Sequence, residues 1–182
     1  MVLNKEYWEN RYESATTNWD IGEISTPLKE YIDQLKDKNS RILIPGAGNA
    51  YELDYLIENG FQNVFVIDYA KHPLDAIINR NKSLEKHLIH DDFFNHNGTY
   101  DLILEQTFFC ALDPSLRQKY VTHMYNLLSE QGYIVGVFFN INFQKQGPPF
   151  GGNEKDYLEL ILDQHLFPHL ARYQIVIPLV GK

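Results

Sequence analysis

The chain has 182 residues, a length that fits one domain and can bury a sizeable core. Its formal net charge of −8 argues against a nucleic-acid backbone as the main partner. It has no apolar run long enough to span a bilayer, and its N-terminus lacks the hydrophobic stretch of a secretory signal. The single cysteine, Cys110, excludes an internal disulfide and a cysteine-rich zinc site, and the scattered histidines predict no metal. We expect a cytoplasmic, single-domain protein spanning 1–182.

Short apolar runs alternate with amphipathic stretches along most of the chain. Strands are predicted at 41–45, 63–68, 88–90, 100–104 and 133–141, helices at 50–59, 73–83 and 116–129, and a turn at 130–132. Gly60 is expected to end the first of these helices, and Pro73 lies near the start of the second. Strands that alternate with helices predict an α/β fold: a doubly wound, mostly parallel sheet with helices on both faces.

The first 38 residues form a predicted N-terminal cap that is helical and rich in aromatic side chains. Trp8 and Tyr12 are four positions apart and share a face if this segment is a helix. Trp19 follows, and a second amphipathic helix is predicted at 28–35. Two interpretations remain open: the aromatic residues cover a ligand, or they pack on the edge of the sheet.

A glycine-rich turn, Gly46-Ala47-Gly48, ends the first predicted strand. Glycines there let the backbone approach a ligand closely, at the sheet edge where open α/β folds bind ligands. Asp68 ends the second strand 20 residues later, where a carboxylate accepts hydrogen bonds from ribose hydroxyls. The alternative role for Asp68 is the N-cap of the next helix. Together the two features favour an adenosine-containing cofactor.

The third and fourth predicted strands also end in acidic residues. Asp92 is a candidate acceptor for an adenine amino group, with Phe93 beside the ring, although a solvated loop carboxylate is the simpler interpretation of Asp92 alone. Glu105 is a candidate for steering an acceptor or taking its proton. Cys110 is expected to be a small buried side chain rather than a nucleophile, because no histidine lies near it in sequence. The Gly- and Pro-rich loop 146–152 either closes over a substrate or forms a simple turn.

Seven motifs in order give the chain its family resemblance. They are Tyr7–Tyr12 (YWENRY), Asn18–Gly22 (NWDIG), Ser25–Leu28 (STPL), Ile44–Gly48 (IPGAG), Asp92–Phe94 (DFF), Phe108–Pro114 (FFCALDP) and Gly147–Phe150 (GPPF). From about Tyr7 to Tyr157 the sequence resembles the thiopurine S-methyltransferase family, which includes plant thiol and halide methyltransferases. The resemblance implies a Rossmann-like, class I S-adenosylmethionine-dependent methyltransferase that releases S-adenosylhomocysteine and acts on a small-molecule acceptor, with a monomer favoured.

The resemblance also implies roles for individual residues. The residues that it assigns to the cofactor are Trp8, Tyr12, Trp19, Gly46, Gly48, Asp68, Tyr69, Asp92, Phe93 and Glu105. It assigns catalysis to Glu105 and Arg117, with Arg117 helping an acidic thiol to bind as its anion. It assigns the wall of the substrate site to Gln106, Phe109, Pro148 and Phe150. Because thiophenols and thiopurines ionise readily, positioning is expected to matter more than base catalysis.

Departures from the family pattern leave alternatives open. Glu105-Gln106 stands where many relatives have Asp-Tyr, so a halide or thiocyanate is an alternative acceptor. The sequence ends at Lys182, before the final strand of many relatives, so the last edge strand is expected to be missing. A cofactor-binding relative without turnover is therefore a further alternative. A nicotinamide-dependent dehydrogenase is disfavoured, because it predicts a second catalytic domain or a proton-relay pair.

Overall fold

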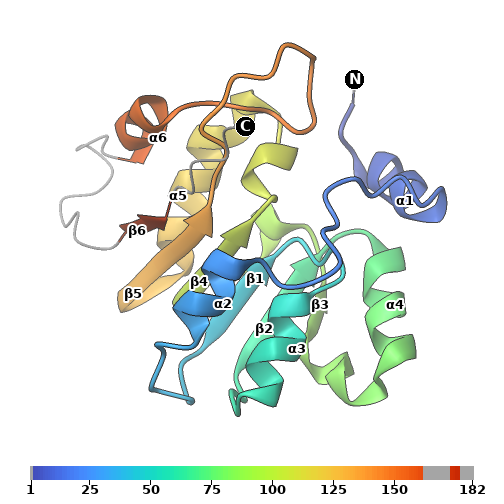
Figure 1. Cartoon of the computed structure of the whole chain (residues 1–182), viewed down its shortest axis with the longest axis vertical. Helices are drawn as coiled ribbons and strands as arrows, with labels where there is room; N and C mark the ends of the chain where they lie inside the picture. The colour runs from blue at the N-terminus through green and yellow to red at the C-terminus, as the bar shows by residue number, and fades with distance from the viewer. Residues whose placement is uncertain (1, 162–172, 177–182) are drawn as a thin grey trace. The chain divides into compact units, whose positions relative to one another are not determined.

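The computed structural model describes residues 2–161 and 173–176 (Figure 1). These residues fall into two compact units, 1–97 and 98–182, and each unit carries its own strands and helices.

Three parallel strands form the sheet of the first unit, in the order β3-β2-β1. They are β1 (Ile42–Pro45), β2 (Val64–Asp68) and β3 (Leu88–His90). The side chains of β1 are all buried, as expected for an apolar strand covered on both faces. The register pairs Pro45 with Ile67 and Asp68 with His90, so the carboxyl ends of the strands share one edge. The three strands predicted in this region are confirmed to within one residue.

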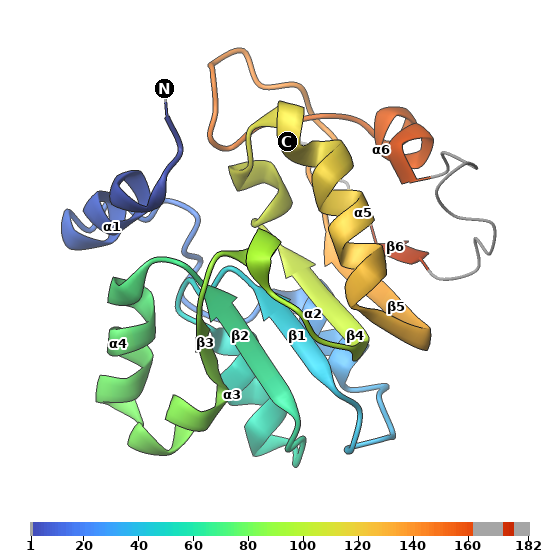
Figure 2. The ribbon, with the colours of Figure 1, turned by 180° about the vertical axis from the view of Figure 1, so that it is seen from behind.

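Three helices accompany these strands. They are α2 (Thr26–Ile32), α3 (Tyr51–Glu58) and α4 (Lys71–Arg80). Figures 1 and 2 place α2 and α3 on the same face of β1 and β2, and α3 buries Leu53 and Leu56. After α3 the chain turns at Gly60, whose φ of +87° favours glycine, as predicted.

Helix α4 begins two residues before Pro73, where the prediction placed its start. Proline in the first turn lacks only an N–H that has no partner within the helix, so it does not prevent the earlier start. The helix ends at Arg80 rather than Ser83, and a 3-10 helix, η1 (Lys82–His87), follows. The side chain of Asn81 accepts from the N–H of Ser83 and stabilises this change.

The N-terminal segment forms α1 (Lys5–Glu13), which brings Trp8 and Tyr12 onto one helix as predicted. Asn4 caps it by accepting from the N–H of Tyr7 at 3.0 Å. Both ribbon views place α1 beside the N-terminal end of α4.

The second unit contains β4 (Tyr100–Gln106), β5 (Leu128–Val137) and β6 (Tyr173–Val176), parallel and in that order. Helix α5 (Arg117–Leu127) lies against one face of β4 and β5, and α6 (Glu154–Ile161) follows the loop after β5 (Figure 2). The apolar face of α5 buries Val121, Met124 and Leu127.

Two details of the second unit correct the prediction. The strand predicted at 133–141 runs from Leu128 to Val137, and the predicted turn at 130–132 lies inside it as an irregularity in the pairing. A Cβ at Gly132 would come within 2.5 Å of the carbonyl oxygen of Tyr100, so a glycine is required at this irregularity. The edge strand that is expected to be missing would follow Lys182, so the described residues do not test this expectation.

Candidate functional site

The glycine turn after β1 has the backbone geometry expected of a ligand cradle. Gly46 and Gly48 have φ of +79° and +49°, a region that L side chains rarely adopt. Gly46 donates from its N–H to the carbonyl of Ile67 at 2.8 Å. A Cβ built on Gly48 meets nothing within 4 Å, so the backbone borders open space. A ligand that binds at this turn therefore faces the main chain rather than side chains.

Asp68 ties the end of β2 to this turn. Its Oδ2 accepts from the N–H of Ala47 and its Oδ1 from the N–H of Ala70, each at 2.8 Å. Burial raises the pKa of the carboxyl to about 6, although the two N–H donors lower it. The alternative role as N-cap of α4 is wrong, because the N-cap is Ala70 and Asp68 bonds to Ala70 itself rather than to the helix.

The aromatic residues of the predicted cap form one cluster. The ring of Trp19 makes edge-to-face contacts with Trp8 at 5.7 Å and with Tyr12 at 5.6 Å between centroids. Arg11 lies over the Trp19 ring at 5.4 Å. Burial and the charge of Asp68 raise the pKa of Tyr12, whereas hydrogen bonding with the backbone of Gly48 opposes this. The cluster therefore reaches the glycine turn.

Asp20 is a residue of this region that the sequence analysis missed. Its carboxylate accepts from Asn49 Nδ2 at 2.6 Å, from the hydroxyl of Tyr51 at 2.9 Å and from the N–H of Gly22 at 2.8 Å. These bonds join the segment that carries Trp19 to the exit of the glycine turn. The signal was present in the sequence, since Asp20 directly follows Trp19 in one of the family motifs.

The third strand end brings two more of the predicted cofactor residues into the first unit. Asp92 caps the short 3-10 helix η2 (Phe93–Asn95) by accepting from the N–H of Phe94 at 2.9 Å, and its own side chain is exposed. Phe93, the next residue, is buried. Tyr69 follows Asp68, and its pKa is raised by burial and by the charges of Asp68 and Asp92. The ends of β2 and β3 thus carry the two predicted carboxylates, Asp68 and Asp92.

Glu105 in the second unit is completely buried, with 0% of its surface exposed. Its Oε1 accepts from the N–H groups of Phe108 and Phe109, each at 2.9 Å, and its Oε2 from the Tyr120 hydroxyl at 2.7 Å. Burial raises the pKa of the carboxyl to about 7, and these donors lower it. Both oxygens therefore hold the turn after β4.

That turn contains a strained residue and the single cysteine. Thr107 has φ of +65°, an unusual value for a β-branched side chain. Cys110 is buried as expected, in the 3-10 helix η3 (Phe109–Ala111), and its Sγ donates to the carbonyl of Thr107. Burial and the charge of Glu105 raise the pKa of the thiol to about 12, so Cys110 is uncharged at neutral pH.

Arg117 joins this turn to the Gly- and Pro-rich loop. Its Nη2 donates to the carbonyl of Gly151 at 2.8 Å, and its guanidinium lies 4.7 Å from the centroid of the Phe109 ring. The N–H of Phe150 donates to the carbonyl of Cys110 at 2.7 Å. The structure therefore brings together three segments that are distant in sequence.

The remaining predicted substrate residues lie on the same segments. Gln106 ends β4 and Pro148 lies in the loop, and both are partly exposed. Tyr157 of α6 was missed by the sequence analysis. Its ring contacts Phe109 at 5.4 Å between centroids, and its hydroxyl donates to the carbonyl of Phe139 at 2.8 Å.

Residues 2–161 and 173–176 contain neither a candidate metal-binding cluster nor a candidate membrane-spanning helix. No group of three or more His, Cys, Asp or Glu side chains within these ranges is arranged to hold a metal ion. No helix of this part of the chain has both the length and the apolar composition needed to cross a membrane.

Comparison with known proteins places these residues in a family. The family described as thiopurine S-methyltransferase (TPMT) matches residues 3–179. The chain is 26% identical over 161 residues to "Probable thiol methyltransferase 2" of Arabidopsis thaliana, covering 85% of this chain and 71% of that protein. It is 26% identical over 149 residues to "Thiocyanate methyltransferase 1" of Brassica oleracea, covering 79% of this chain and 66% of that protein.

The fold has relatives among solved structures. The 1,6-didemethyltoxoflavin-N1-methyltransferase of Burkholderia thailandensis, solved with S-adenosylhomocysteine, matches with a TM-score of 0.66 and 16% identity, covering 87% of this chain and 74% of that one. This likeness confirms the predicted open, mostly parallel, Rossmann-like α/β fold. Because the family match extends over nearly the whole sequence, the chain belongs to the thiopurine S-methyltransferase family of S-adenosylmethionine-dependent methyltransferases.

Proposed function

We propose that this enzyme transfers the methyl group of S-adenosylmethionine to a small thiol that binds as its thiolate. The observation that carries the proposal is the contact of the Arg117 guanidinium with the Phe109 ring, beside the loop that contains Phe150. A fixed positive charge next to an apolar ring suits an aromatic thiolate, which is both anionic and flat. The names of the relatives, thiol and thiocyanate methyltransferases, support the same class of acceptor.

The first unit has the groups that would hold the cofactor. The open space beside Gly48 and the positive φ of both glycines fit close approach of a ligand to the backbone. We assign the ribose to Asp68, the adenine to Asp92 with Phe93, and the methionine end to Trp8, Tyr12 and Trp19. Tyr69, the residue after the end of β2, is assigned to the cofactor as well. When bound, S-adenosylmethionine supplies a sulfonium methyl group that a thiolate accepts without further activation.

The second unit has the groups proposed to bind the acceptor. Arg117 would favour the ionised thiol, and Phe109, Phe150, Pro148 and Gln106 would form the wall around it. A lowered acceptor pKa raises the fraction present as thiolate, the nucleophilic form. Orienting that thiolate and excluding water are the tasks left to the protein.

For Glu105 we propose a positioning role. Its two oxygens already accept three hydrogen bonds from within the second unit, and its side chain is fully buried. A general base must reach the proton that it removes. The carboxylate therefore acts on catalysis through the Phe108–Phe109 turn, which it holds in place.

A panel of acceptors tests the proposal. The protein is incubated with S-adenosylmethionine and thiophenol, a thiopurine, iodide or thiocyanate, and formation of S-adenosylhomocysteine is measured. We expect turnover of the thiols, with a lower KM for the more acidic thiol. Turnover of iodide or thiocyanate without turnover of any thiol would refute the thiol assignment and favour the second candidate, a halide or thiocyanate methyltransferase, which the Brassica relative supports.

A thermal shift separates enzyme from binding protein. S-adenosylhomocysteine that raises the Tm while no acceptor is methylated would indicate a cofactor-binding relative without turnover.

The acidic net charge and the lone cysteine support a cytoplasmic enzyme that acts on small molecules rather than on nucleic acid. We propose that it works as a monomer.

A further inference from the structure

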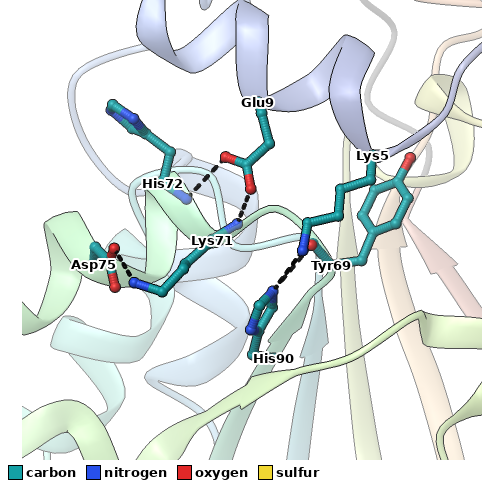
Figure 3. A network of polar contacts seen from close by, with 7 residues as sticks. All are labelled: Lys5, Glu9, Tyr69, Lys71, His72, Asp75 and His90. Carbon is teal, nitrogen blue, oxygen red and sulfur yellow. Dashed lines mark hydrogen bonds and ion pairs between the residues drawn. The ribbon is translucent and has the colours of Figure 1, made fainter.

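We propose that Glu9 is a positioning residue for cofactor binding, because its carboxylate docks α1 onto the N-terminus of α4. This inference rests on the proposal that the first unit binds S-adenosylmethionine. Glu9 Oε1 accepts from the N–H of Lys71 at 2.5 Å, and Oε2 accepts from the N–H of His72 at 3.1 Å. Figure 3 shows the carboxylate reaching down from α1 to both N–H groups.

Helix α4 needs this carboxylate. Its N-cap is Ala70, which has no side-chain acceptor, and its first turn contains no acidic residue. The first N–H groups of a helix have no partner within the helix, and the positive end of the helix dipole lies there. Glu9 satisfies two of these donors and places a negative charge at that end. The cap that α4 lacks in its own sequence is supplied by α1.

Helix α1 needs the contact as well, because none of its nine residues is buried. Its aromatic side chains Trp8 and Tyr12 are only partly buried, so polar contacts add to what holds the helix. Directional contacts to the rest of the unit remain: the hydroxyl of Tyr69 donates to the carbonyl of Leu3 at 3.1 Å, and Lys5 Nζ lies 3.2 Å from His90 Nε2. Each of these contacts is a single bond, whereas the Glu9 carboxylate accepts two bonds (Figure 3).

The docking contact is connected directly to the cofactor side chains. Tyr12 lies on the same helix, three residues after Glu9, and its ring stacks on His72 with centroids 6.1 Å apart. The Tyr12 hydroxyl in turn interacts with the backbone of Gly48 and with the charge of Asp68. Loss of the Glu9 bonds releases α1 and with it Tyr12 and Trp8. The affinity for the cofactor then falls although Glu9 need not touch the cofactor.

The sequence provides its own reporter for this movement. The two tryptophans of the chain, Trp8 and Trp19, both lie in the N-terminal segment and contact each other. Intrinsic tryptophan fluorescence therefore reports on docking of α1 without a label. A red shift of the emission in the absence of any ligand indicates release of the segment to solvent.

The experiment compares Glu9→Ala, Glu9→Gln and Glu13→Gln in the full chain. Glu13 is an exposed acidic residue of the same helix, so Glu13→Gln controls for loss of one charge. The dissociation constant for S-adenosylhomocysteine is measured by fluorescence titration. We expect a rise of about tenfold for Glu9→Ala, about threefold for Glu9→Gln, which keeps one acceptor oxygen, and no change for Glu13→Gln. The emission of unliganded Glu9→Ala should shift to the red.

Steady-state kinetics distinguish positioning from general destabilisation. The KM for S-adenosylmethionine should rise in both Glu9 variants, while the KM for the acceptor stays within twofold of wild type. An unchanged dissociation constant in Glu9→Ala, or equal changes in Glu9→Gln and Glu13→Gln, would overturn the inference. If no acceptor is methylated but S-adenosylhomocysteine binding depends on Glu9 as described, the inference stands and the proposed thiol transfer fails. Absence of S-adenosylhomocysteine binding by the wild-type protein would overturn both.

Discussion

The hydroxyl of Tyr120, on α5, donates a 2.7 Å hydrogen bond to Oε2 of Glu105, on β4. The other oxygen of the same carboxyl group accepts from the N–H groups of Phe108 and Phe109. A buried carboxyl group thus connects the helix to the turn that carries the FFCALDP motif. Its burial makes the stability of this connection sensitive to pH.

Glu105→Gln should remove one source of pH dependence. The folded-state pKa of Glu105 is about 7, against an ordinary value of 4.5, so its ionisation opposes folding. The neutral carboxyl group stabilises the folded protein. This contribution to the free energy of unfolding is complete below pH 4.5 and is lost as the pH rises through 7. We expect the wild-type protein to lose on the order of 2–3 kcal/mol relative to Glu105→Gln between pH 4.5 and 8.

Urea unfolding of the two proteins at pH 5 and pH 8 provides the check. Glutamine keeps an acceptor oxygen for the two N–H groups and a donor for the tyrosine oxygen, so the turn is retained. Tyr120→Phe is the matched comparison, because it removes one bond and leaves the carboxyl group. Parallel pH profiles for wild type and Glu105→Gln would contradict the assigned pKa shift.

Thr107→Gly tests the strain in the same turn. A β-branched residue at φ of +65° costs on the order of 1–3 kcal/mol, and glycine adopts this conformation without that cost. The greater freedom of glycine in the unfolded chain offsets part of the gain. We expect a net increase of about 1 kcal/mol in the free energy of unfolding, measured by urea titration. Thr107→Ala, which keeps a Cβ, should give no such increase, and a loss of stability in Thr107→Gly would show that the turn is not strained.

The sequence predicted the strands well where burial alone determines them. The apolar runs that became β1 and β2 have few polar interruptions, so their limits were correct to within one residue. The prediction was wrong for the region around Gly132, because an irregularity in strand pairing depends on the partner strand and leaves no local signal beyond the glycine itself.

The candidate site followed a similar pattern. Glycines and acidic residues at strand ends carry a recognisable spacing, so Gly46, Gly48, Asp68 and Asp92 were predicted. Asp20 and Glu9 were not predicted, because they contact Asn49 and Lys71, which lie 29 and 62 positions away in the sequence. Such contacts depend on how helices and loops pack. No periodicity in the sequence reports them.

Arg117→Lys should affect the acceptor and not the cofactor. Lysine keeps the charge, but it lacks the planar group that donates to Gly151 while stacking on Phe109. We expect the KM for the thiol to rise about tenfold, with the dissociation constant for S-adenosylhomocysteine unchanged. Arg117→Met, which removes the charge as well, should raise the KM further, most clearly for the more acidic thiol. Equal KM values for Arg117→Lys and wild type would show that the charge alone suffices.

Asp68→Asn should weaken cofactor binding and make it independent of pH. An amide has one acceptor oxygen, so it cannot accept from both Ala47 and Ala70, and its NH₂ group faces the remaining N–H donor. The glycine turn then loses one of its attachments, and the proposed ribose contact loses its charge. We expect the dissociation constant for S-adenosylhomocysteine to rise at least about tenfold at pH 8, measured by calorimetry.

The pH dependence distinguishes this role from a purely structural one. The pKa of Asp68 is about 6, so the wild-type carboxyl group is ionised at pH 8 and largely protonated at pH 5. If the carboxylate holds the ribose hydroxyls, wild-type affinity falls between pH 7 and pH 5, whereas that of Asp68→Asn stays level. Glu52→Gln is a suitable control, because burial raises the pKa of this carboxyl group too, but on α3. If the pH profile of Asp68→Asn follows that of wild type, the titration belongs to another group. The role of Asp68 would then be limited to holding the glycine turn.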